Sequence, residues 1–108
     1  MTEQYIKKMI EKTKREFAVE RYGDIDINIT HRAFIGVPSK HQNDSKIIIL
    51  MTDPFRKNKE FYEFTVDSID RMEEIGTITN EDGQSAMKVR IWVKKGVPAI
   101  KAKPFIVK

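Results

Sequence analysis

Apolar residues near the N-terminus recur at helical spacing. Residues three or four positions apart share one face of a helix, and the set found here is Tyr5, Ile6, Met9, Ile10, Thr13 and Phe17. Thr2 is a suitable N-cap, and Gly23 is a suitable stop. The pattern predicts a helix over about 2–19, within a helical region 1–22, that packs its apolar face on a sheet.

After Gly23 the apolar residues recur at every second position instead of at the helical spacing of about 3.6 residues. Ile25, Ile27 and Ile29 alternate with polar residues, which is typical of a half-buried strand. Residues 33–37 either continue this strand or begin a second one, and the polar stretch 38–45 follows as a loop. The alternation predicts that the chain from residue 24 to 108 is an antiparallel β region.

Three further extended segments follow. Residues 47–52 are apolar on both faces, which predicts a central strand that ends at Asp53 and Pro54. Residues 61–66 are strand-like, and residues 67–70 resemble a turn or a single helical turn. Residues 97–107 contain two prolines, which favour an edge position.

A hairpin is predicted between residues 75–79 and 86–93. A three-residue loop, Glu81-Asp82-Gly83, uses the glycine at positive φ and pairs Glu74 with Arg90. A two- or four-residue loop shifts the register by one and pairs Glu73 with Arg90. In either case the alternation predicts that the core-facing residues of the second strand are Met87, Val89, Ile91 and Val93.

One helix followed by short-connected strands defines the fold class. We predict a single α+β domain over residues 1–108, with an N-terminal helix and a small antiparallel sheet. The sheet is expected to have five to six strands and to be barrel-like or strongly bent.

Composition excludes several classes of protein. The chain has 108 residues and no cysteine, so disulfides, thiolate zinc sites and cysteine nucleophiles are absent. The longest apolar run, residues 47–51, is far shorter than the roughly 20 residues of a membrane span. We expect no targeting signal at the N-terminus, because the first residues include neither a basic region nor an apolar run. We expect a soluble, cytoplasmic protein without a membrane partner.

The net charge of +4 conceals two opposed blocks. Residues 60–82 carry eight acids and one base, whereas residues 86–108 carry seven bases and no acid. The hairpin places one block beside the other, so cross-strand pairing is the simplest expectation.

The basic block is a candidate nucleic-acid site. Cations bind phosphates and aromatic rings stack on bases, and both kinds of residue alternate along the last two extended segments. The candidate residues are Arg90, Trp92, Lys94, Lys101, Lys103 and Phe105.

The acidic block is a candidate divalent-metal site. Clustered carboxylates suit Mg²⁺ or Ca²⁺, and such an ion would serve hydrolysis of a phosphate or pyrophosphate. The candidate ligands are Asp67, Asp70, Glu73 and Glu74.

The rest of the sequence contains no motif of catalytic residues. His31 and His41 form no known metal or triad motif, and both are expected at the surface, His31 near a strand end. No serine lies in a nucleophile motif, and no glycine-rich loop is present, so no cofactor is expected. We therefore favour a non-catalytic binding or assembly module over an enzyme. The self-complementary charge blocks also suit a homodimer.

Overall fold

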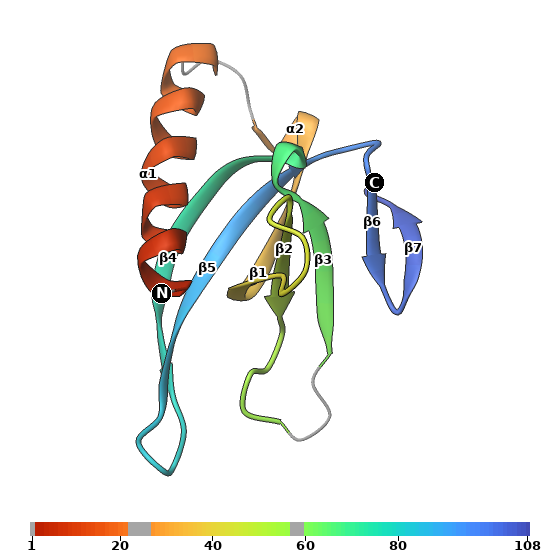
Figure 1. Cartoon of the computed structure of the whole chain (residues 1–108). Helices are drawn as coiled ribbons and strands as arrows, with labels where there is room; N and C mark the ends of the chain where they lie inside the picture. The colour runs from red at the N-terminus through yellow and green to blue at the C-terminus, as the bar shows by residue number, and fades with distance from the viewer. Residues whose placement is uncertain (1, 22–26, 57–59) are drawn as a thin grey trace.

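A computed structural model describes residues 2–21, 27–56 and 60–108 of the chain (Figure 1). The helical elements are α1 (Thr2–Arg21), α2 (Ile27–Thr30) and the 3₁₀ turn η1 (Val66–Ser68). The strands are β1 (His31–Lys40), β2 (Ile47–Met51), β3 (Phe61–Thr65), β4 (Ile69–Thr79), β5 (Ser85–Lys94), β6 (Pro98–Lys101) and β7 (Lys103–Ile106).

The α+β class and the antiparallel sheet are confirmed. The sheet has seven strands in the described residues, in the order β4-β5-β1-β2-β3-β6-β7, rather than five to six. It is not closed into a barrel, because β4 and β7 are the two ends of this order. The strand 47–52 was predicted to be central, and β2 is the middle strand.

The strand predicted from Ile25 is wrong over Ile27–Thr30, which form the one-turn helix α2. Ile25 itself lies outside the described residues. The sheet begins at His31, which pairs with Lys94, the last residue of β5. Since β5 ends there, Ile27–Thr30 have no strand opposite them in the described residues, and alternation alone does not make a strand.

β1 joins two halves of the sheet. Its first part, residues 31–36, pairs with β5, and its second part, residues 37–40, pairs with β2. Gly36 lies at the change of partner, where a Cβ atom would lie only 2.5 Å from the carbonyl oxygen of Met51. Only glycine allows this approach. β4 and β5 are accordingly inclined to β2 and β3 (Figure 1).

The β4–β5 hairpin has the predicted three-residue loop. The Asn80 N–H donates to the Gln84 carbonyl at 3.0 Å, and Gly83 has a φ of 81°. The register predicted from this loop nevertheless fails, because β4 has a bulge between Glu74 and Gly76. The bulge shifts the pairing by one residue, so Glu73 rather than Glu74 lies opposite Arg90.

The helix α1 packs mainly on β4 and covers the β4 side of one face of the sheet, here called the inner face (Figure 1). Ile6 and Met9 of α1 are buried against this face. Val89, Ile91 and Val93 of β5 belong to the face itself and are buried, as the alternation predicted. Thr13 is buried too, and its hydroxyl accepts a hydrogen bond from the Met72 N–H at 3.0 Å. The opposite side of the sheet is called the outer face.

Candidate functional site

The predicted nucleic-acid residues of β5 lie on the outer face and are neutralised there. Arg90 lies 3.7 Å from a carboxylate oxygen of Glu73, and the Trp92 indole N–H donates to the same oxygen at 2.7 Å. Lys94 lies 3.6 Å from Asp70. Cross-strand pairing between the acidic and basic blocks is therefore confirmed for Arg90 and Lys94, whose charges are partly neutralised by the protein's own carboxylates.

The predicted residues of β6 and β7 lie on the inner face. Lys101 pairs with Lys103 and Ala99 with Phe105 across this hairpin, so all four side chains project to one side. Ala99 is buried in the core, which identifies that side as the inner one. The prediction that Lys101, Lys103 and Phe105 share a face is confirmed.

The structure does not bring the two groups together. β1, β2 and β3 separate β5 from β6, so the two groups lie about 19 Å apart along the sheet at the usual strand spacing. They also project from opposite faces. Arg90, Trp92 and Lys94 therefore do not share a surface with Lys101, Lys103 and Phe105.

An aromatic cluster adjoins Phe105 on the inner face. Phe105 contacts the Tyr62 ring of β3 edge-on with a centroid distance of 6.0 Å, and Tyr62 lies 5.2 Å from Phe34 of β1. Beneath them Phe64, which is 1% exposed, anchors the cluster at 4.8 Å from Phe34. Phe34, Tyr62 and Phe105 are half-buried, so part of each remains accessible.

Three cations border these rings. The guanidinium carbon of Arg32 lies 5.9 Å from the Phe34 centroid, and the Lys101 ammonium lies 5.0 Å from the Tyr62 centroid. Lys103 is paired with Lys101 across the β6–β7 hairpin. The Arg32 guanidinium donates a hydrogen bond to the main-chain oxygen of Lys108 at 3.3 Å. Within the described residues, none of Arg32, Lys101 and Lys103 has an aspartate or glutamate carboxylate within 4.0 Å. We call the whole set the aromatic–cationic surface: Arg32, Phe34, Tyr62, Lys101, Lys103 and Phe105.

Sequence reasoning identified three members of this surface and missed Arg32, Phe34 and Tyr62. Tyr62 and Phe64 lie two residues apart in β3 and therefore share a face. This spacing could have indicated Tyr62 from the sequence. Phe34 and Arg32 come from β1, whose neighbours in the sheet are not encoded by local spacing.

The four predicted metal ligands do not converge on one point. Asp70 bonds His31, Glu73 bonds Trp92 and Arg71, and Asp67 and Glu74 are exposed. In residues 2–21, 27–56 and 60–108, no three side chains of histidine, cysteine, aspartate or glutamate are placed to hold an ion. The geometry gives the metal-assisted hydrolase no support.

His31 was expected at the surface, but it is 2% exposed. Its Nδ1 lies 2.6 Å from the Thr30 hydroxyl and its Nε2 lies 2.7 Å from Asp70, an order of groups also found in acyl-transfer triads. The Thr30 carbonyl accepts the Lys95 N–H, and Asp70 also pairs with Lys94. These contacts tie the ends of α2, β1 and β5 to the start of β4, so we assign the network a structural role.

Comparison with known proteins gives no assignment. No protein-family model, curated protein or solved structure matches the chain. Among the helices of the described residues, none is both long and apolar enough to cross a membrane.

Proposed function

We propose that the protein is a non-catalytic binding module whose ligand is single-stranded nucleic acid, held on the aromatic–cationic surface. One observation carries the proposal: in the described residues, three accessible rings lie beside three cations that no aspartate or glutamate neutralises. The contrast with β5 supports it, because Arg90 and Lys94 there are paired with the protein's own carboxylates.

The chemistry of the surface favours a single strand over a duplex. In a single strand each base offers a π-face to an aromatic side chain, while its phosphates are free to contact cations. A duplex hides those faces inside its stack. Because Arg32 and Lys101 lie directly over rings, a base stacked on the cluster would carry its phosphates next to a positive charge.

A direct binding titration tests the proposal. Protein is added to a fluorescently labelled single-stranded oligonucleotide at about 50 mM salt, and the anisotropy is followed beside that of the matching duplex. We expect saturable binding of the single strand, tighter than binding of the duplex. No binding of the single strand at this salt concentration would overturn the proposal.

Trp92 fluorescence separates the two basic surfaces. Trp92 lies on the outer face and donates to Glu73, away from the aromatic–cationic surface. We therefore expect its emission to stay unchanged at saturating oligonucleotide, because no base stacks on it. Strong quenching in the same titration would instead indicate binding at Arg90 and Lys94.

A further inference from the structure

The outer face exposes an apolar patch. Its most exposed members project from β1, β3, β6 and β7. Ile49 and Met51 of β2 lie between the members on β1 and β3, and Glu63 of β3 lies between Ile49 and Ile100. The side chains of the most exposed members are between 39% and 52% exposed: Ile35, Phe61, Ile100 and Ile106. In the described residues nothing covers these side chains, and exposed apolar patches rimmed by polar residues mark interaction surfaces. We call these four residues the outer apolar patch.

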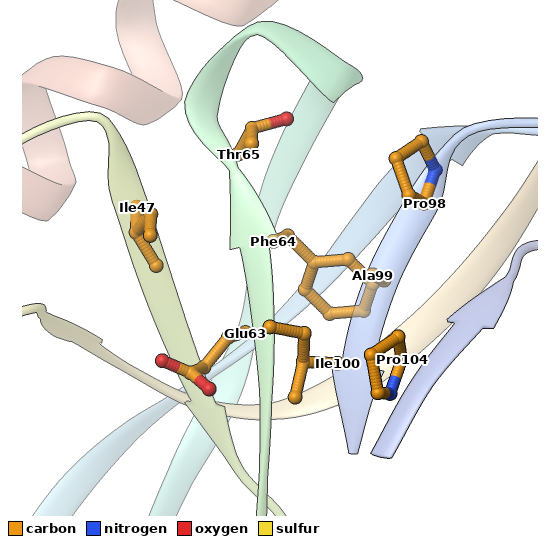
Figure 2. A pocket seen from close by; sticks show the side chains of 8 residues that line it. All are labelled: Ile47, Glu63, Phe64, Thr65, Pro98, Ala99, Ile100 and Pro104. Atoms are coloured by element: carbon orange, nitrogen blue, oxygen red, sulfur yellow. The ribbon is translucent and has the colours of Figure 1, made fainter. Parts of the chain in front are cut away.

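A pocket of about 240 Å³ opens within the same face (Figure 2). β3 and β6 pair only between Glu63 and Ile100, and beyond that pair Pro98 has no N–H to offer Thr65. The strands therefore separate, and Phe64 and Ala99 of the core line the opening. Since an engineered cavity of about 150 Å³ binds benzene, this pocket has room for one large apolar side chain.

We propose that a second copy of this chain covers the outer apolar patch, with Ile106 of each copy inserted into the pocket of the other. Ile106 is 52% exposed and pairs with Pro98, which lines the pocket. The protruding side chain and the pocket are thus about one strand spacing, or 4.8 Å, apart. A two-fold axis that passes between Ile106 and the pocket places the Ile106 side chain of each copy in the pocket of the other. Such reciprocal contact is the requirement for an isologous interface.

Charge at the rim fits the same arrangement. Glu63, whose carboxylate also lies 3.4 Å from the His41 imidazole, lines the pocket. Lys108, two residues beyond Ile106, is exposed and has the opposite sign to Glu63. Inserting Ile106 of one copy brings Lys108 of that copy toward Glu63 of the other. Such complementarity favours one orientation over others.

Pairing of strand edges is a poorer route to a dimer. The β7 edge contains Pro104, which lacks a donor, and Lys103, which repels a second copy. The β4 edge is interrupted by two register shifts. Packing of outer faces also leaves the aromatic–cationic surface of each copy open, so one dimer would present two such surfaces and gain avidity for a long strand.

Sedimentation velocity over a range of protein concentrations tests the dimer. We expect the wild-type chain to shift from monomer to dimer, and Ile106→Asp to stay monomeric with an unchanged circular dichroism spectrum. Ile29→Asp is the matched control, because Ile29 is 70% exposed but lies in α2, outside the patch. A wild-type monomer at every concentration would contradict the proposal and leave the patch to a different partner.

Disulfide trapping tests the predicted insertion. The chain has no cysteine, so introduced thiols have no competitors. Mixing Ile106→Cys with Thr65→Cys under oxidising conditions should give a linked heterodimer, because Thr65 lines the pocket. Mixing Ile29→Cys with Thr65→Cys should not. Equal yields from the two mixtures would overturn the proposed geometry even if a dimer is present.

Discussion

Replacing Gly36 with alanine is expected to lower the free energy of unfolding by about 3 kcal/mol. The new Cβ atom would lie 2.5 Å from the Met51 carbonyl oxygen and 3.0 Å from the Leu50 side chain. Neither group can move easily, since one is backbone of the middle strand and the other is fully buried in a close-packed core. Urea denaturation of the variant and the wild-type chain measures the difference.

Gly83→Ala is the matched control for this prediction. A Cβ atom at Gly83 meets nothing within 4 Å, but the residue has a φ of 81°, which costs about 1–2 kcal/mol for alanine. We expect the loss at Gly36 to be clearly larger. If Gly36→Ala costs no more than Gly83→Ala, close approach at the corner of β1 is not what requires glycine there.

Replacing Phe105 with leucine is expected to weaken binding of a single-stranded oligonucleotide about tenfold, at almost unchanged stability. Leucine keeps apolar contact with Tyr62 but offers no π-face. Stacking of one base on an aromatic side chain contributes about 1–3 kcal/mol, and about 1.4 kcal/mol corresponds to tenfold. Anisotropy titration gives the affinity, and thermal unfolding verifies the fold.

Phe55→Leu carries the same chemical change at a residue outside the aromatic–cationic surface. Phe55 is exposed in the segment after β2 and is not part of the aromatic cluster. Its replacement should leave the affinity unaltered. Equal losses in the two variants, or no loss in Phe105→Leu, would show that bases do not stack on the cluster.

Local spacing predicted those parts of the fold that depend on near neighbours. The apolar face of α1, the loop at Gly83 and the buried set of β5 all follow from periods of 3.6 or two and from turn chemistry. Each of these features is determined within about a dozen residues. The central position of β2 also followed, because a run that is apolar on both faces is typical of a strand with a neighbour on each side.

Features that depend on distant pairing were not predictable in the same way. Ile27 and Ile29 alternate like strand residues, yet β5 ends too early to pair with them. The bulge between Glu74 and Gly76 moves Glu73 opposite Arg90, and this one-residue shift decides which carboxylate neutralises Arg90.

Only those members of the aromatic–cationic surface that lie close together in the sequence could be predicted. Lys101, Lys103 and Phe105 were identified because they alternate along one short segment. Phe34 and Tyr62 join them only through the strand order β1-β2-β3-β6-β7, in which chain neighbours are not always sheet neighbours. The charge blocks were visible in the sequence, but the division of the basic block between two faces was not.

The salt dependence of oligonucleotide binding tests the central claim most directly. For single strands, the slope of log affinity against log salt concentration changes by about 0.7 for each phosphate contact. The double variant Lys101→Gln/Lys103→Gln should bind more weakly at low salt, with a slope shallower by about 1.4 if each lysine contacts one phosphate. The matched variant Lys88→Gln/Lys94→Gln removes two lysines from the outer face of β5 and should keep the wild-type slope. Equal slopes for the two double variants, or a loss confined to the β5 pair, would contradict the assignment of the aromatic–cationic surface.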